Sequence, residues 1–99
     1  MILEVAPLDI IKGKELEFEA SFKKAQIIIS SMPGYISHQL QKCIEIENRY
    51  LLLVNWETLE HHLVGFRESA EYIEWKRILH HFYAPFPVVE HYQIVGMAS

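Results

Sequence analysis

The sequence predicts an α+β fold of the ferredoxin-like kind, with elements in the order β-α-β-β-α-β. Short apolar stretches rich in β-branched residues alternate with two longer stretches whose apolar residues recur at helical spacing. The chain has 99 residues, enough for one hydrophobic core, so we expect a single domain over residues 1–99. Hydrophobic residues make up 51% of the chain, which is high for so small a protein. This excess indicates that a second chain covers part of the surface.

The first half of the chain is expected to hold a strand, a helix and a second strand. Residues 2–8 are apolar and indicate a strand that ends at Pro7. A helix should follow and stop near Ser31, because the Pro-Gly pair just beyond it cannot continue a helix. Residues 35–44 are expected to form the second strand. The apolar face of the helix is expected to consist of Phe18, Phe22, Ala25 and Ile29.

A hairpin is expected to join the second strand to a third strand over residues 49–57, through a polar turn at 45–48. The middle of the third strand, Tyr50–Val54, is apolar at every position instead of alternating. Such a pattern is typical of a strand that is buried on both faces. The helices of one chain can cover only one face, so this strand also predicts a homodimer.

Two helices and a last strand are expected in the remaining third. Thr58 suits the N-cap of a short helix over 59–65, which Gly65 would end or bend, and Ser69 suits the N-cap of the next helix. The prolines at 85 and 87 end that second helix, and residues 88–95 form the final strand. The apolar face of the second helix is expected to hold Tyr72, Trp75, Leu79 and Phe82.

Charge and composition exclude several classes of function. The net charge is −4 and the nine Lys and Arg residues are scattered, so we expect no binding to nucleic acid. No apolar run approaches the roughly 20 residues that span a bilayer, so we expect no membrane partner. The first residues lack the pattern of a signal peptide, which indicates a cytoplasmic protein. The single cysteine, Cys43, cannot form an intramolecular disulfide, and no glycine-rich phosphate loop is present.

The six histidines raise the question of a metal site. Adjacent histidines on a helix point about 100° apart, so His61 with His62 cannot chelate one ion as an i, i+4 pair does. We therefore predict no metal. A one-residue shift of the helix would exchange the inward positions of His61 and His62, and both stay candidates.

Aromatic residues in the second half suggest a site for a flat aromatic ligand, with Trp56, Phe66, Tyr72 and Trp75 as candidate walls. For any single one of these aromatic residues, packing of the core is the more common explanation. The more specific candidate pair is Trp56 with His62, because a helix that follows a strand end is a place where pockets open.

Three segments resemble one known family. The stretch Asn55–Ser69 has a strand that ends in Trp, a Thr-x-Glu helix start and a following His, and it resembles the antibiotic biosynthesis monooxygenase domain. The segment 33–37, Pro-Gly-Tyr-Ile-Ser, is similar to the entry of that family's second strand. The segment 86–92 resembles the last strand of one subgroup.

The resemblance implies a dimeric α+β barrel, in which two ferredoxin-like sheets pack face to face. It also implies oxygenation of small quinol-like or polyketide-like aromatics without metal, flavin or other cofactor. By this analogy His62 is a general base or hydrogen-bond partner, Trp56 is a pocket wall, and Tyr72 supplies a phenolic hydrogen bond. The first strand has Ala6 where a haem-degrading branch has Asn, which argues against haem degradation.

Two other functions fit the same residues. One is a non-enzymatic dimer, binding small molecules or related to stress, that uses the same pocket. The other is an isomerase or a related proton-transfer enzyme, in which His62 works without oxygen. A fold alone does not decide among these three, because one scaffold hosts many functions.

Overall fold

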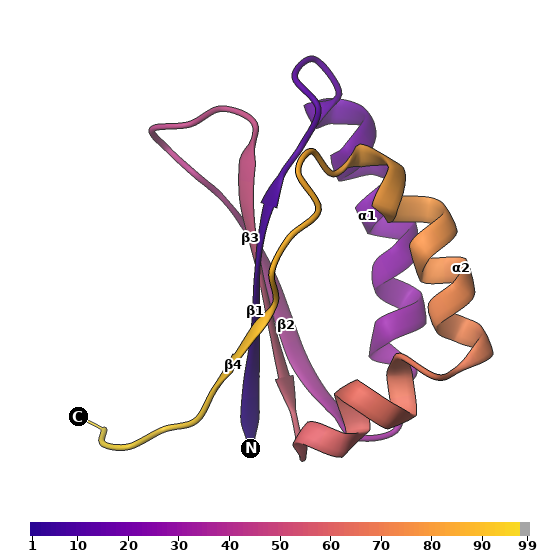
Figure 1. Ribbon diagram of the computed structural model, residues 1–99, viewed down its shortest axis with the longest axis vertical. Coiled ribbons are helices and arrows are strands. Elements are labelled where there is room, and N and C mark those ends of the chain that lie inside the picture. Colours follow the sequence, from indigo (N-terminus) through magenta and orange to yellow (C-terminus); the bar gives the residue numbers. More distant parts are fainter. Residues whose placement is uncertain (98–99) are drawn as a thin grey trace.

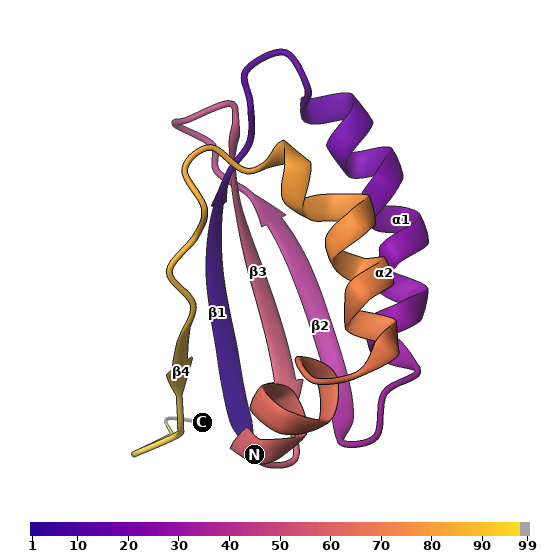
Figure 2. The same ribbon diagram turned by 45° about the vertical axis from the view of Figure 1, so that its right-hand side comes forward.

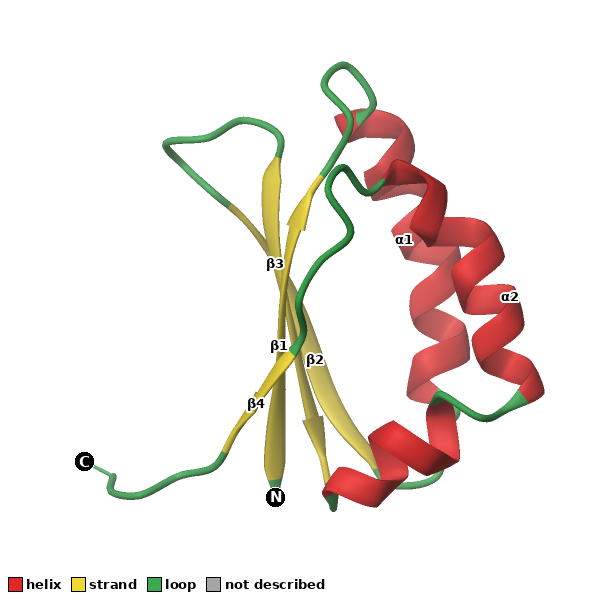
Figure 3. Ribbon diagram, viewed as in Figure 1, coloured by secondary structure: helices red, strands yellow, loops and turns green. Residues whose placement is uncertain are grey.

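The computed structural model describes residues 1–97, in which four strands and two main helices follow in the predicted order. The strands form one antiparallel sheet in the order β2-β3-β1-β4, as Figure 2 shows. Both helices lie on the same side of this sheet (Figures 1 and 3). The predicted ferredoxin-like α+β class is therefore confirmed. The elements are β1 (Ile2–Asp9), α1 (Glu15–Ser30), β2 (Tyr35–Lys42), β3 (Arg49–Trp56), the π-helical turn η1 (His61–Phe66), α2 (Ala70–Leu79), the 3₁₀ turn η2 (His80–Phe82) and β4 (Glu90–Tyr92).

The first strand does not end at Pro7 as predicted, and Pro7 pairs with Leu51 inside β1. The Ile10 N–H donates to the Asn48 carbonyl, 2.8 Å away on the β3 side. Because strand backbone groups alternate in direction, the nitrogen of Pro7 points to the other side, toward the β4 edge. There β4 reaches only as far as Val5. A proline is tolerated here because no strand within residues 1–97 needs its missing N–H.

Four other details differ from the prediction. The second strand ends at Lys42 and not at residue 44, and β4 covers only Glu90–Tyr92 of the predicted 88–95. Gly65 neither ends nor bends a helix but lies inside η1. Phe82 belongs to η2, after the end of α2. The predicted cap of α2 is confirmed, because the Ser69 hydroxyl accepts the Tyr72 N–H at 3.1 Å.

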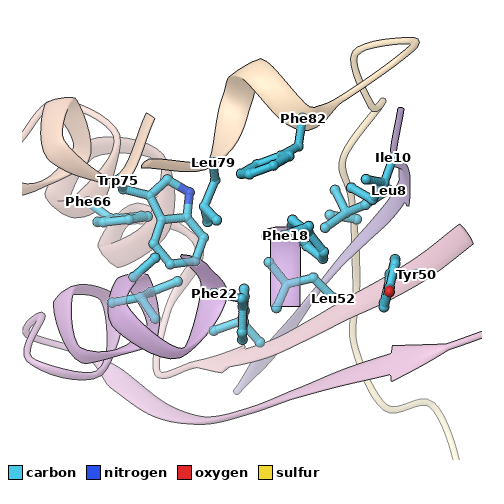
Figure 4. Close-up of a cluster of buried hydrophobic side chains, with 14 of the residues drawn as sticks. Leu8, Ile10, Phe18, Phe22, Tyr50, Leu52, Phe66, Trp75, Leu79 and Phe82 are labelled. Atoms are coloured by element: carbon cyan, nitrogen blue, oxygen red, sulfur yellow. The ribbon is translucent and has the colours of Figure 1, made fainter. Parts of the chain in front are cut away.

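The core fills the space between the sheet and the two helices (Figure 4). The inward residues of β3, Tyr50, Leu52, Val54 and Trp56, alternate with half-buried or exposed neighbours. All four residues predicted for the apolar face of α1 are buried. Burial of this apolar surface is the main force that holds the sheet and the helices together. The largest fully buried side chains are Trp56, Tyr50, Phe18, Phe66, Leu8 and Ile10.

The opposite face of the sheet carries no helix (Figure 1). Leu51 and Leu53 of β3 point there and are only half-buried, and Leu3 and Val5 of β1 are likewise half-buried. The segment after β4 leads away from the sheet and exposes Ile94, Val95 and Met97 (Figure 1). Among residues 1–97, no helix is long and apolar enough to cross a membrane.

Candidate functional site

A pocket of about 250 Å³ opens between the sheet, η1, α2 and the segment that leads to β4. Its floor is formed by inward residues of β1 and β3, namely Glu4, Ala6, Leu8 and Leu52. Its walls are mostly aromatic, with few polar groups. Small-molecule sites in proteins commonly combine a concave apolar surface with a few such groups. The walls are Phe66, Tyr72, Trp75, His80, Tyr83 and Phe86.

Glu4 is the acidic group of the floor and is only 6% exposed. Its neighbours on the same face of β1 are the apolar Ala6 and Leu8, so alternation along the strand carries the carboxyl group into the interior. The Trp56 indole Nε1–H donates to Glu4 Oε1 at 2.9 Å. Burial raises the pKa of Glu4 to about 6, although the Trp56 hydrogen bond and the charge of Arg67 lower it.

His62 lies directly beside Glu4 and is 2% exposed. Its Nε2 is 3.3 Å from Glu4 Oε1, and its Nδ1 forms a 2.8 Å hydrogen bond with Nε2 of His91. The imidazole stacks on the Trp56 indole, with ring centroids 5.4 Å apart and planes 18° apart. Burial lowers the pKa of His62 to about 3, and the nearby Arg67 and His91 lower it as well. His62 is therefore neutral at physiological pH.

The π-helical turn explains why His62 points inward. Such turns advance more than four residues per turn, so residues four apart lie nearly above each other. His62 and Phe66 are accordingly the two buried residues of η1, and their rings lie 6.4 Å apart. π-Helical turns are frequent at functional sites. Phe66 in turn contacts Tyr72 and Trp75 of α2, with centroids 5.1 and 5.6 Å away.

Arg67 supplies positive charge to the pocket. It lines the pocket but is exposed, and its side chain forms no ion pair within residues 1–97. Its charge lowers the pKa of Glu4 and of three histidines, His62, His80 and His91. An unpaired cation beside an apolar pocket favours ligands that are negatively charged or become so.

Four of the six predicted site residues line the pocket, namely His62, Phe66, Tyr72 and Trp75. Trp56 lies behind them, fully buried, where it supports Glu4 and His62. His61 is outside the pocket lining. Its Nδ1 is 2.8 Å from the Thr58 hydroxyl, and its ring packs against Gly34.

The site also contains three residues that were not predicted from the sequence, namely Glu4, Arg67 and His91. A signal for Glu4 was present, because a carboxylate in the apolar register of a predicted strand must be buried and therefore needs polar partners. Only the fold reveals that His91 lies opposite Glu4, because the pairing of β1 with β4 joins the two ends of the chain. Within residues 1–97, no three His, Cys, Asp or Glu side chains are grouped so that they could hold a metal ion.

The fold and the pocket define a ferredoxin-like α+β domain with a concave aromatic site over its sheet. The model of the family described as antibiotic biosynthesis monooxygenase matches residues 1–78, and the chain belongs to this family. The predicted family resemblance is thereby confirmed.

Several relatives resemble the whole chain. The uncharacterized protein YczJ of Bacillus subtilis strain 168 is 59% identical over 95 residues, which cover 96% of this chain and all of YczJ. A solved structure from Bordetella bronchiseptica, assigned to the same family, is 36% identical with a TM-score of 0.91, covering 95% of this chain and 96% of its own. A point mutant of SnoaB, a cofactor-independent oxygenase from Streptomyces nogalater, has a TM-score of 0.84 at 14% identity, over 97% of this chain and 94% of its own. At that identity the likeness to SnoaB shows the fold alone.

Proposed function

We propose that this single-domain protein is a cofactor-independent monooxygenase of small quinol-like or polyketide-like aromatics. The observation that carries the proposal is a buried acid–base pair, Glu4 and His62, at the floor of an aromatic-walled pocket. Membership in the antibiotic biosynthesis monooxygenase family supports the same activity.

The chemistry needs little from the protein. Once a phenol or an activated ring CH₂ loses a proton, the resulting anion is electron-rich enough to donate an electron to dioxygen. The ring CH₂ and O₂ then yield a carbonyl and water, so the substrate itself supplies the electrons. The protein must remove the proton, hold the ring away from water and orient it toward oxygen.

Five residues of the pocket have a role in this proposal. The Glu4–His62 pair removes the proton, and Phe66 and Trp75 pack against the faces and edges of the substrate ring. Tyr72 offers a phenolic hydroxyl as a hydrogen-bond donor; burial raises its pKa, so the hydroxyl keeps its proton. Trp56 supports the pair from behind, and His61 has no part in the reaction.

We propose in addition that two copies pair through the sheet face that lacks helices. The half-buried Leu3 and Val5 of β1, together with Leu51 and Leu53 of β3, form an apolar surface there. A second copy would bury this surface, which agrees with the high hydrophobic content of so short a chain.

Oxygen uptake tests the proposed activity directly. Metal-free, flavin-free protein is mixed with a panel of reduced quinols and anthrones, beside a blank without protein, because these compounds autoxidise. We expect uptake above the blank, and a loss of about 10² or more in His62→Ala, a typical size for an acid–base group. His81→Ala, which changes an exposed histidine outside the pocket, should keep full activity.

Three results would contradict the proposal in different ways. Uptake that is unchanged in His62→Ala would exclude His62 from the reaction. No uptake with any compound of the panel would favour the non-enzymatic ligand-binding dimer, and turnover of a substrate without oxygen would favour an isomerase.

A further inference from the structure

The two oxygen atoms of the buried Glu4 carboxyl group have different surroundings. Oε1 accepts the Trp56 indole N–H at 2.9 Å and faces His62 Nε2 at 3.3 Å. Oε2 has no hydrogen-bond partner within residues 1–97. Among these residues, every buried side-chain nitrogen or oxygen that is inaccessible to solvent does have a hydrogen-bond partner. Oε2 has none, so it is not fully shielded from solvent. Glu4 lines the pocket, and Oε2 is its carboxyl oxygen without a protein partner, so Oε2 is the atom free to accept a hydrogen bond from a bound ligand.

The imidazole of His62 is held at both ring nitrogens and on one ring face. Nδ1 is hydrogen-bonded to His91, Nε2 faces Glu4, and the ring face is stacked on Trp56. Its ring nitrogens thus have polar protein neighbours, and its orientation is fixed by them. A residue in this position is better suited to orient a carboxylate than to meet a ligand itself.

We infer that Glu4 Oε2 is the atom that takes the proton of an aromatic hydroxyl bound in the pocket, and that His62 is a positioning residue that acts through Glu4. The O–H bond of the ligand breaks and an O–H bond forms at Oε2. The negative charge passes from the carboxylate to the ligand oxygen, in a pocket that Arg67 also lines. This inference rests on the proposed function for the oxygenation that follows, but the proton transfer can be tested without it.

Acidity agrees with this assignment. A group that accepts a proton near neutral pH works best when its own pKa is near that pH. The pKa of Glu4 is about 6, whereas that of His62 is about 3, so His62 is the weaker base of the two. The charged and titratable groups around Glu4 are His62, Arg67, His91, Tyr72 and Tyr83.

The ligand class follows from the same geometry. A carboxylate that points into an apolar pocket accepts a hydrogen bond from a phenol, but an aryl methyl ether has no proton to offer. A matched pair of probes therefore reports on Oε2: 1-naphthol and 1-methoxynaphthalene. Hydrogen bonds to charged groups are worth about 1.5–3 kcal/mol, so wild-type protein should bind the naphthol about tenfold more tightly or better at pH 7.5.

Two variants separate Glu4 from His62. In Glu4→Gln the amide oxygen must stay near Trp56, because the indole N–H needs an acceptor, so the NH₂ group faces the pocket. An acceptor thereby becomes a donor, and we expect the preference for naphthol to vanish. In His62→Gln the carboxylate remains, so most of the preference should persist. Calorimetric titration measures the affinity of each protein for both probes, and thermal unfolding checks that each variant is folded.

A second readout needs no variant of His62. The ¹³C signal of the Glu4 carboxyl carbon, assigned by its absence in Glu4→Gln, should move on addition of naphthol and stay in place with the ether. The preference should also weaken below about pH 6, where Glu4 itself becomes protonated.

Equal affinity for the two probes in wild-type protein, or no binding of either, would overturn the inference. So would a preference that survives in Glu4→Gln and is lost in folded His62→Gln, because His62 would then be the acceptor. A naphthol preference that depends on Glu4, in a protein that consumes no oxygen, would uphold this inference while the proposed oxygenase fails.

Discussion

Trp56 and Glu4 join the ends of two neighbouring strands through one buried hydrogen bond, in which the indole Nε1–H donates to the carboxyl Oε1 at 2.9 Å. Trp56 is fully buried, so its N–H would cost free energy without an acceptor. Glu4 is buried as well, so its carboxylate needs a donor. Each group thus makes the burial of the other tolerable, and the pair places a carboxyl group in an apolar core.

Replacement of Trp56 by Phe tests this relationship. The hydrogen bond from Trp56 lowers the pKa of Glu4, so its loss should raise that pKa above its value of about 6. We also expect the protein to lose about 1.5–3 kcal/mol of stability for the charged hydrogen bond, besides some packing. ¹³C titration of the Glu4 carboxyl group and urea unfolding measure the two effects. A pKa that stays the same or falls would show that the indole does not act on Glu4 as described.

Acid should destabilise the protein through His62. Its pKa is 6.5 in the unfolded chain and about 3 in the fold, so the folded state keeps the ring neutral. The contribution of His62 to stability is therefore complete above pH 6.5. It is lost as the pH falls toward 3, by about 1.4 kcal/mol for each pH unit. Glu4 has the opposite effect on stability. Its pKa rises from 4.5 to about 6 on folding, so its contribution to stability increases as the pH falls from about 6 to 4.5.

Urea unfolding at pH 7, 5.5 and 4.5 measures this loss. His62→Gln should lose clearly less stability than wild type over that range, because its side chain does not titrate. Replacement of the exposed His81 by Gln is the matched control and should leave the wild-type slope in place. Parallel slopes for wild type and His62→Gln would contradict a buried neutral His62.

Gly34 is constrained twice, by its backbone and by His61. Its φ is +82°, and an added Cβ would overlap the His61 ring. Gly13 has a similar φ of +91° but open space around it. Gly13→Ala should therefore cost about 1 kcal/mol for backbone strain alone.

Gly34→Ala should cost clearly more than Gly13→Ala, because His61 must also move away from its Thr58 contact. Chemical unfolding of both variants measures the difference. Equal costs would show that the His61 ring yields freely and that its packing on Gly34 contributes little.

The proposed dimer should depend on the outward face of β3. Leu53 lies on that face, opposite Val5 of β1, so Leu53→Lys would place a charge in the middle of the proposed interface. Ile73 of α2 is 66% exposed, on the helical side of the protein, and Ile73→Lys is the control.

Sedimentation equilibrium should show a dimer for wild type and Ile73→Lys, and a monomer for folded Leu53→Lys. A wild-type monomer at all concentrations would contradict the proposal. A dimer that tolerates Leu53→Lys would place the interface elsewhere on the surface.

The element order could be predicted because periodicity along the chain is a local property. The face of α1 shows this, since its four predicted apolar residues are all buried. The prediction that the first strand ends at Pro7 is wrong, because a strand can contain a proline where no neighbouring strand needs its N–H. Whether that is so depends on where β4 ends, which is a property of the sheet and not of the strand. Likewise, the short β4 could not be foreseen, because a run of apolar residues does not specify how much of it finds a partner.

The candidate site could be predicted only in part, for the same reason. The aromatic residues of α2 can be predicted from helical spacing. The choice between His61 and His62 cannot, because a shift of the helix by one residue would exchange which of the two points inward. In the structure the π-helical turn carries His62 into the interior. The Glu4–His62–His91 contacts join three elements distant in sequence, and no local pattern predicts such a meeting.

Arg67 links these groups electrostatically, which leads to a last prediction. Its positive charge lowers the pKa of Glu4, His62, His80 and His91. Removal of that charge in Arg67→Gln should therefore raise all four pKa values together. A carboxylate loses a stabilising charge, and each imidazolium loses a repelling one, so the direction is the same for both types of group.

Arg77→Gln is the control, because Arg77 pairs with Glu74 on the exposed surface of α2 and does not line the pocket. NMR titration of the histidine and glutamate side chains, at low salt, follows all four groups. The shifts should shrink at high salt, because Arg67 is exposed and its field is screened within about 10 Å at 0.1 M. Shifts of opposite sign for Glu4 and the histidines would show that the Arg67→Gln substitution rearranges the pocket, since the loss of one charge cannot produce them.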